Sequence, residues 1–414
     1  MAMTHDDEGG AADSPAGRRG PTRRYEARRN AIVSSAVEEM NRKGVRGMTL
    51  GDVAARLDLV PTGVIYYFRN KEELAAAAFL KGVRSYEALI ASAAGEATAE
   101  GRLTTFLLAW FDYSRRVQIG EADRLPVFND VRALNSPVVN EAYVGMFRQY
   151  RALLPPDLPR LHANARAHML LSQMFWIPAW AHQVEIDDYP RTAERMARIL
   201  ARGVAAGGAP WPRPRPLEPA ASEPAAASEP FLRAATCLIN EEGYHGASVE
   251  KISARLNVSK GAFYHHNQTK DELVLACFQR TFDIMWRAIH ASESAGGSGL
   301  EVLVSAVAAL IQHQVSGEAP LLRTSALTAV PETLRAGLLQ RFERLSYRVA
   351  SILCDGVADG SATPVDVNIA SQVISSAINA AAELHYWTPG APPEAVVDLY
   401  VRPLFEGLCS PAAT

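Results

Sequence analysis

The sequence predicts an all-α protein built from two copies of one unit, in which a three-helix head precedes a longer helical body. Three observations predict this class. Apolar residues recur at three- and four-residue spacing along most of the chain, and the alternation typical of strands is nearly absent. A proline-rich segment divides the 414 residues near their middle. The two sides of that segment match one another, which indicates a duplication.

The chain is expected to fall into six segments. The first, 1–17, is rich in Gly, Ala and acidic residues and is expected to be a disordered tail. Seven prolines between positions 210 and 230 forbid a continuous helix, so 205–229 is expected to be a semi-rigid linker. The other segments are expected to be a first head at 18–74, a first body at 75–204, a second head at 230–274 and a second body at 275–410.

The composition argues against several classes of protein. The net charge of -3 gives no whole-chain signature of nucleic-acid binding, so any basic surface must be local. No apolar run approaches the roughly 20 residues of a transmembrane helix, and the N-terminus lacks a signal-peptide core, so we expect a cytoplasmic protein. The four cysteines are scattered without C-x-x-C spacing, which argues against a disulfide framework or a zinc site. Because the chain also lacks a phosphate-binding glycine loop and a G-x-S-x-G string, we expect neither an enzyme nor a cofactor.

The two halves match at a constant offset of 199 residues. Gly44 falls on Gly243 and Lys71 on Lys270. Over 36–74, ten of 39 positions are identical without a gap. So long a period indicates duplication of a whole unit and not a solenoid of short repeats.

Each copy begins with the pattern of a helix-turn-helix motif. In the first copy a predicted helix over 28–43 ends at Gly44, and Thr49 is placed to cap the next helix. After a short turn, Pro61 begins a second short helix that runs to about Phe68. In this motif the second short helix enters the major groove of DNA. The second copy keeps the pattern, and its second short helix is rich in lysine, tyrosine and histidine, all of which are donors suited to phosphates.

Two strings in these helices resemble the recognition-helix signature of the TetR family. They are L-V-P-T-G-V-I-Y-Y-F-R-N-K-E-E-L in the first half and V-S-K-G-A-F-Y-H-H followed by T-K-D-E-L in the second. The resemblance covers about 45 residues of each copy. It implies two fused subunits, each with a DNA-binding head, a body that holds a small ligand, and a dimer interface made by the last two long helices. Ile65 departs from the family's usual tyrosine, and Asn267 from its usual aromatic residue.

The resemblance implies DNA contacts from both heads. For the tyrosines the alternative role is core packing, and for the two matched lysines it is a solvated helix start. In the first head the residues carried over are Thr49, Pro61, Thr62, Gly63, Tyr66, Tyr67 and Lys71. In the second head they are Ser248, Ser259, Lys260, Gly261, Tyr264, His265, His266 and Lys270.

The first head carries more positive charge than the second. Segment 18–74 holds twelve Lys and Arg against seven Asp and Glu, whereas 230–274 holds five of each. Because phosphate neutralisation dominates affinity, the first head is expected to bind DNA more tightly. Arg23, Arg24 and Arg28 are expected to form an arm that reaches a neighbouring groove or the DNA backbone. The alternative for this arm is a solubilising tail.

The bodies are expected to hold the ligand and to pair the two halves. The resemblance implies a pocket for a hydrophobic or aromatic molecule, although an apolar stripe is more often ordinary core or dimer interface. The last two helices of each body would pair within one chain as a pseudo-dimer or between two chains as a homodimer. These helices are expected at about 162–183 and 190–204 in the first body and at about 366–388 and 393–408 in the second. Candidate ligand-binding residues are Trp110, Tyr113, Phe147, Met169, Gln173 and Trp176 in the first body and His313 and Trp387 in the second.

The sequence therefore predicts a DNA-binding transcriptional regulator. Its expected partners are double-stranded operator DNA and a small effector. The resemblance implies that the effector more commonly releases the protein from DNA, in which case the protein is a repressor. The alternative is a helical ligand-sensing or scaffold protein in which one or both heads no longer bind DNA.

Overall fold

The computed structural model describes residues 23–208, 211–215, 229–258, 269–317 and 320–412. Within these ranges the chain is built of helices, and the only extended pairing is an isolated antiparallel bridge between Ala205 and Ala362. The predicted all-α class is confirmed. The expected tail at 1–17 and most of the expected linker at 205–229 lie outside the described residues.

The first head is a three-helix unit whose breaks follow from its sequence. Helix α1 (Arg23–Gly47) kinks at Gly44, where a φ of 71° favours glycine. Thr49 caps α2 (Leu50–Ala55), and its hydroxyl accepts a hydrogen bond from the backbone N–H of Asp52 at 3.0 Å. Helix α3 (Pro61–Ile65) begins at its proline. The predicted glycine break, threonine cap and proline start are confirmed, but α3 ends earlier than the predicted Phe68.

The second head repeats this design as far as the structure describes it. Helix α9 (Glu229–Gly246) kinks at its matching glycine, with a φ of 74°, and Ser248 caps α10 (Val249–Arg255). The turn after α2 and the turn after α10 place Asp58 and Asn257 in the left-handed region, with φ of 52° and 55°. These residue types tolerate that region better than most. The repeat therefore extends to the backbone conformation of the turn.

A continuous helix joins each head to its body. The expected boundaries at 74 and 274 fall inside the helix that leads into each body. The first body contains α4 (Lys71–Ala91), α5 (Ala99–Gln118), α6 (Pro137–Tyr150), α7 (Arg160–Trp180) and α8 (Tyr189–Arg202). The second contains α12 (Lys270–Ala295), α13 (Gly299–Val315), α14 (Glu332–Ala358), α15 (Val367–Ala380), α16 (Leu384–Trp387) and α17 (Arg402–Glu406), which follows a π-helical turn (Val397–Val401).

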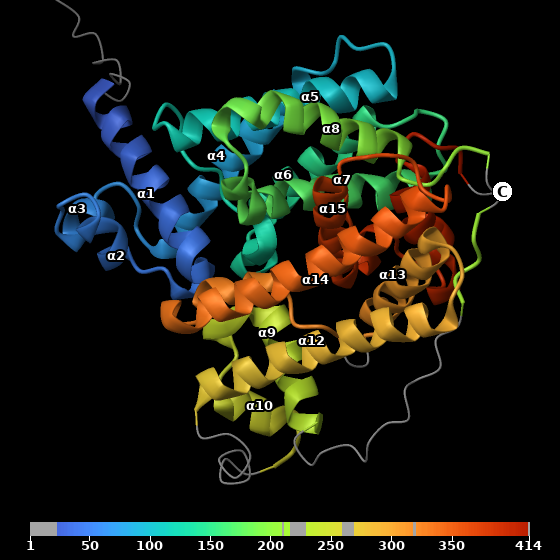
Figure 1. Ribbon diagram of the computed structural model, residues 1–414. Coiled ribbons are helices and arrows are strands. Elements are labelled where there is room, and N and C mark those ends of the chain that lie inside the picture. Colours follow the sequence, from blue (N-terminus) through green and yellow to red (C-terminus); the bar gives the residue numbers. More distant parts are fainter. Residues whose placement is uncertain (1–22, 209–210, 216–228, 259–268, 318–319, 413–414) are drawn as a thin grey trace, which may run out of the picture.

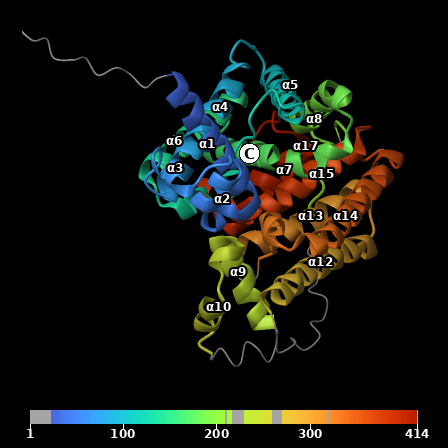
Figure 2. The same ribbon diagram turned by 90° about the vertical axis from the view of Figure 1, so that its left-hand side faces the viewer.

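The two bodies pack against one another, and the heads project from them. In Figure 1, α7 and α15 lie in the middle, with α5 and α8 above them and α12, α13 and α14 below. In Figure 1 the first head (blue) lies at the left of the bodies and the second head (yellow-green) lies below them, and Figure 2 turns the first head toward the viewer. Helices α3 and α10 lie apart in both views, with α9 between α10 and the first head.

The two halves pair through α7 and α15, which cross in opposite directions. The hydroxyls of Ser172 and Ser376 lie 3.4 Å apart at the centre of the crossing. On one side of this pair, His168 Nε2 lies 2.9 Å from the carbonyl oxygen of Ala380. On the other side, the indole N–H of Trp176 donates to the side-chain oxygen of Gln372 at 3.0 Å. An offset of 204 residues pairs His168 with Gln372 and Trp176 with Ala380, so it converts one flanking contact into the other. The crossing therefore has pseudo-two-fold symmetry, with different residues in equivalent positions.

Backbone hydrogen bonds join the ends of the two halves in the same symmetric way. The N–H of Ala205 donates to the carbonyl of Phe405 at 2.9 Å, and the N–H of Cys409 donates to the carbonyl of Ala201 at 3.1 Å. These two bonds are equivalent at the offset of 204. We call this pair of bonds the clasp.

Two glycines allow the chains to approach at the clasp. Gly203 has a φ of 71° and Gly407 a φ of 96°. A Cβ atom on Gly203 would lie 2.0 Å from the carbonyl oxygen of Phe405, and a Cβ atom on Gly407 would lie 2.3 Å from that of Ala201. The clasp therefore requires glycine at both positions for two reasons, conformation and space.

We expect Gly203→Ala to lower the free energy of unfolding by about 3 kcal/mol or more, because left-handed strain adds to a clash with backbone. Gly360→Ala is the matched control, since Gly360 has a φ of 81° but a Cβ atom at that position would have no neighbour within 4 Å. Only the strain of about 1–2 kcal/mol is expected there. Urea unfolding measures both variants, and equal losses would contradict a close-packed clasp.

Candidate DNA-binding heads and ligand pocket

The exposed face of the first head carries a cluster of three tyrosines. Tyr66 is 74% exposed at the end of α3, which excludes the core-packing alternative for it, whereas Tyr67 is half-buried. The ring of Tyr67 lies 4.8 Å from that of Tyr25 on α1 and 5.1 Å from that of Tyr66. Arg24 and Arg28 line the same surface groove as the tyrosines. Guanidinium groups and phenol O–H groups therefore share one concave surface.

The expected arginine arm is a helix in the described structure. Arg23, Arg24 and Arg28 lie in the first two turns of α1, and their side chains are exposed. The prediction of an arm is therefore wrong for these residues. The physical reason is that the sequence from 23 to 31 is rich in strong helix formers and lacks glycine and proline. Helix α1 therefore fixes the positions of the three cations, and Arg24 and Arg28 line a groove with Tyr66 and Tyr67 at the end of α3.

The other candidates of the first head lie near the tyrosines or support them. Pro61 and Thr62 are exposed at the start of α3, and Gly63 is half-buried in it. The hydroxyl of Thr49 is engaged with the Asp52 carboxylate at 2.8 Å as part of the helix cap.

The matched lysines each bind a carbonyl at the end of the first helix of their head. Lys71 Nζ donates to the carbonyl of Arg46 at 3.1 Å. Lys270 Nζ donates to the carbonyl of Tyr244 and lies 4.1 Å from the centre of the Tyr244 ring. The matching positions of the two lysines in the sequence thus have a structural reason, because each lysine binds a carbonyl at the end of a kinked helix.

The two heads contact each other through an ion pair that the sequence did not reveal. Arg46 Nη1 lies 2.5 Å from Glu242 Oε2, and Lys251 binds the same carboxylate. The Lys251 ammonium and the Arg46 guanidinium hold the pKa of Glu242 below its ordinary value. Arg46 and Glu242 are 196 positions apart, and no sequence pattern indicates that they are neighbours. Only the folded chain shows this contact.

The described part of the second head includes two of its eight candidates. Ser248 is half-buried and accepts a hydrogen bond from the backbone N–H of Lys251 at 3.3 Å, and Lys270 begins α12. The remaining candidates lie outside the described residues: Ser259, Lys260, Gly261, Tyr264, His265 and His266.

The first body contains a cavity of about 460 Å³ between α4, α5, α7 and the segment at 124–127. This volume is within the range of small-molecule pockets. Two of the predicted ligand-binding residues, Trp110 and Tyr113, line it. The cavity is also lined by Asn41, Tyr86, Gln118, Arg124, Leu125, Val127 and His182.

The other predicted ligand-binding residues of the first body do not line this cavity. Gln173 and Trp176 bind residues of α15, because their stripe on α7 faces the crossing with the second half. Met169 lies on the same helix and is fully buried. Phe147 stacks on Trp387 of the second half with 3.5 Å between ring centres. These four residues therefore lie in the core or in the interface between the halves, which was the alternative to a role in ligand binding.

The equivalent cavity of the second body is almost closed. It measures about 30 Å³. Thr98 caps α5 and Ser298 caps α13, and at this offset of 200 residues Gln314 stands where the first body has the shorter Ser114. The Gln314 amide donates to the carbonyl of Ile378 at 3.4 Å and accepts from the N–H of Leu321 at 2.8 Å. Trp176 also lines this small cavity, whereas His313 lines neither of the two.

A matched asparagine links each head to its body. The Asn41 side chain donates to the carbonyl of Leu125 at 2.8 Å and accepts from the N–H of Val127 at 2.9 Å. In the second half Asn240 makes the same two bonds, to the carbonyl of Leu321 at 2.9 Å and from the N–H of Arg323 at 3.0 Å. We call each of these pairs of bonds an asparagine bracket.

The first bracket touches the open cavity, because Asn41, Leu125 and Val127 all line it. Sequence reasoning missed this role of the asparagine. The signal was nevertheless present, since Asn41 and Asn240 are identical across the repeat.

Comparison with known proteins identifies the heads. The family model for bacterial regulatory proteins of the tetR family matches residues 32–78 and again residues 231–277. Both heads are tetR-family domains. The chain is a tandem duplication of TetR-like units, and the family resemblance seen in the recognition-helix strings is confirmed.

Relatives of these TetR-like units match over part of their length. The chain is 40% identical over 50 residues to the Transposon Tn10 TetC protein of Escherichia coli, which is 12% of this chain and 25% of TetC. It is 28% identical over 124 residues to the HTH-type transcriptional repressor DhaR of Mycobacterium sp. (strain GP1), which is 29% of this chain and 62% of DhaR. The chain thus spans less than two thirds of the length of either relative.

Solved structures of single TetR-like proteins match less than half of the chain. Apo AibR is 20% identical, with 43% of this chain and 97% of AibR covered and a TM-score of 0.37. A tetR-family regulatory protein from Rhodococcus RHA1 is 23% identical, with 46% and 100% covered and a TM-score of 0.37.

The described part of the TetR-like tandem contains neither a membrane-spanning helix nor a metal cluster. In the ranges that the structure describes, no helix combines the length and the hydropathy needed to cross a bilayer. Over the same ranges, no three His, Cys, Asp or Glu side chains gather closely enough to hold a metal ion.

Proposed function

We propose that the chain is a transcriptional regulator that binds operator DNA through its heads and acts as a repressor released by a small effector. The observation that carries this proposal is the repeated helix-turn-helix head, matched twice by one family of DNA-binding regulators. The relative DhaR is named as a transcriptional repressor, which supports the same direction of control. An enzymatic role has no support of this kind.

The proposed DNA-binding surface of the first head combines α3 with the start of α1. Tyr66, Tyr67, Arg24 and Arg28 share one groove there, which supports phosphate contacts from donors of both helices. Arg23 begins α1 and Pro61, Thr62 and Gly63 form the first turn of α3, and these four residues extend the proposed surface, whereas Thr49 and Lys71 support the ends of the helices. In the second head the proposed surface comprises the residues carried over from the sequence signature.

The proposed effector site is the cavity of the first body. Its volume of about 460 Å³ against about 30 Å³ in the second body supports one effector for each chain. Trp110 and Tyr113 are the aromatic walls of this proposed site. The second body supports the pairing of the halves and holds the second head.

A gel-shift assay with the promoter of the neighbouring gene tests this function. We expect a shift that weakens steeply as salt rises, because released counterions drive binding to phosphates. The full chain should shift a single operator as one molecule, since its halves pair with each other. No shift at low salt would instead favour a scaffold or ligand-sensing protein whose heads do not bind DNA.

A further inference from the structure

The cavity of the first body offers hydrogen-bond donors and positive charge but no lining acid. Its described lining includes one arginine, Arg124, and one histidine, His182, at the mouth, and neither aspartate nor glutamate. A cavity of this kind disfavours a cationic ligand and favours an anionic one. This inference rests on the proposed function, because it names the effector class of that same site.

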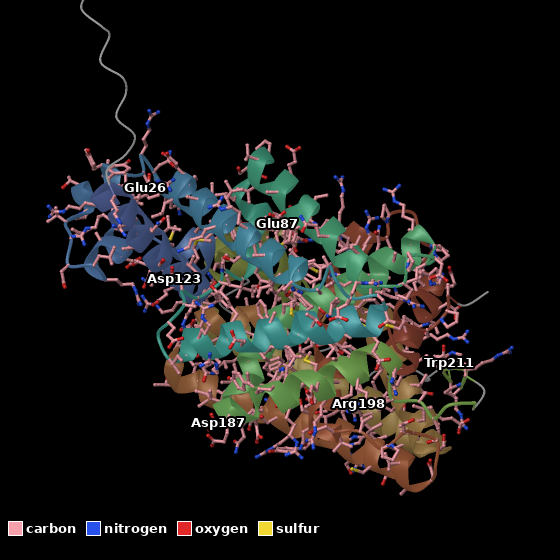
Figure 3. The ribbon with its side chains drawn as sticks, turned by 90° about the horizontal axis from the view of Figure 1, so that it is seen from above. Glu26, Glu87, Asp123, Asp187, Arg198 and Trp211 are labelled. Atoms are coloured by element: carbon pink, nitrogen blue, oxygen red, sulfur yellow. The ribbon has the colours of Figure 1, made fainter. Side chains whose placement is uncertain are left out.

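The arginine at the mouth is free to bind a ligand. Arg124 is exposed, and its side chain has no hydrogen bond or ion pair with any residue the structure describes. The neighbouring carboxylate of Asp123 is already paired with Lys81 at 2.6 Å. In Figure 3, Asp123 lies beside the first head, so the mouth of the cavity is near the head. The guanidinium therefore remains available for a carboxylate, which it can bind through two parallel hydrogen bonds.

The inner wall carries two more donors without acceptors. Tyr86 is 2% exposed and its hydroxyl makes no hydrogen bond in the described part of the chain. Burial, and to a lesser extent Tyr143 and Tyr113, raises the pKa of Tyr86 well above its ordinary value, so the phenol keeps its proton. The buried indole N–H of Trp110 likewise has no acceptor among the described residues. The two rings lie 5.2 Å apart at 30°, and they form an aromatic wall with two unmet donors.

We propose that this cavity binds a flat, apolar carboxylic acid whose carboxylate pairs with Arg124 at the mouth and whose far end places an oxygen acceptor against Tyr86 and Trp110. The opposite orientation would place the charge among aromatic rings, where an ionised carboxylate loses its hydration without a cation to replace it. The rings of Tyr86, Trp110 and Tyr113 supply the flat walls.

The second body lacks the means to bind such an acid. Pro320 takes the place of Arg124 at the offset that pairs Leu125 with Leu321, and Met285 takes the place of Tyr86. The second cavity therefore lacks the arginine and the tyrosine of the first, and it is also much smaller. The site binds one acid for each chain.

Isothermal titration calorimetry on the full chain tests this site with matched probes. The panel is 2-naphthoate, 4-phenylbutyrate and decanoate, each beside its primary amide, and 6-methoxy-2-naphthoate, which adds an oxygen at the far end. We expect 2-naphthoate to bind at one molecule per chain and at least tenfold more tightly than its amide. Arg124→Gln should remove this preference and leave amide binding unchanged. Arg116→Gln is the matched control, because Arg116 is exposed on α5 but does not line the cavity.

The methoxy group tests the inner wall. We expect 6-methoxy-2-naphthoate to bind more tightly than 2-naphthoate, and Tyr86→Phe to abolish that gain without removing a hydrophobic ring. If no carboxylate in the panel binds more tightly than its amide, or if Arg124→Gln and Arg116→Gln act alike, the proposal is overturned. Persistence of the methoxy gain in Tyr86→Phe would overturn the placement of the second oxygen.

The gel shift separates this proposal from the proposed function. A chain that shifts DNA but shows no carboxylate preference remains a DNA-binding regulator with a different ligand class. A chain that binds the acids but never shifts DNA refutes the regulatory function and leaves the ligand site intact.

Discussion

Asn41→Ala is expected to leave the chain able to bind both DNA and effector while removing most of the influence of one on the other. The asparagine bracket holds the segment at 124–127, which lines the proposed effector cavity, against α1 of the first head. Coupling between sites in proteins typically changes affinity by about 5- to 150-fold. We expect the best-binding carboxylate of the panel to weaken DNA binding about tenfold or more in the unmodified chain and less than about threefold in the variant. Fluorescence anisotropy of labelled operator DNA, with and without the acid, measures this ratio.

Asn240→Ala is the matched control for this prediction. It removes the same two hydrogen bonds from the second half, where the bracket lies over a closed cavity. Both variants should lose about 1–3 kcal/mol of stability, because each leaves a backbone N–H and a carbonyl without their partner. Only Asn41→Ala should lose coupling. Equal coupling in the two variants would show that the brackets are structural supports alone.

The double variant Arg24→Ala/Arg28→Ala is expected to weaken operator binding about ten- to a hundredfold near physiological salt, because both guanidinium groups lie on the groove beside α3. The dependence of log Kd on log salt should also become shallower by about 2, which is the expected effect of losing two phosphate contacts. Filter binding or anisotropy over a series of salt concentrations measures both quantities.

Two comparison variants make this result specific. Arg191→Ala/Arg198→Ala removes the same charge from exposed positions on α8, and Figure 3 shows Arg198 at a distance from Glu26 and the first head. Little loss is expected there. Lys260→Ala/His265→Ala tests the second head, and we expect a smaller loss because that head has no excess of positive charge. Equal losses from the two heads would contradict the dominance of the first.

Local features of the fold could be predicted from the sequence because they depend on neighbouring residues. The break at Gly44, the cap at Thr49 and the start at Pro61 each follow from the conformational preferences of one residue type. The arginine segment shows the limit of such reasoning. A charged stretch before a motif suggested an arm, yet the same residues have high helix propensity and extend α1.

The proposed ligand site was predictable only in part, because its shape depends on contacts between distant segments. Trp110 and Tyr113 line the cavity, but the stripe that includes Trp176 faces α15, and one face of a buried helix cannot be told from another by spacing alone. In the smaller second cavity Gln314 is held by hydrogen bonds to Leu321 and to Ile378, which is distant in the sequence, so its position depends on the folded chain.

The pseudo-two-fold crossing of α7 and α15 has a consequence for how this protein can change over generations. In a dimer of identical chains, every substitution at the symmetry axis occurs twice and must be tolerated in both places at once. Here the contact of His168 with Ala380 and the contact of Trp176 with Gln372 occupy equivalent positions with unrelated chemistry. One gene encodes both partners, so each side has been free to diverge alone. Duplication thus permitted the two sides to differ, with an open cavity in one body and a nearly filled core in the other.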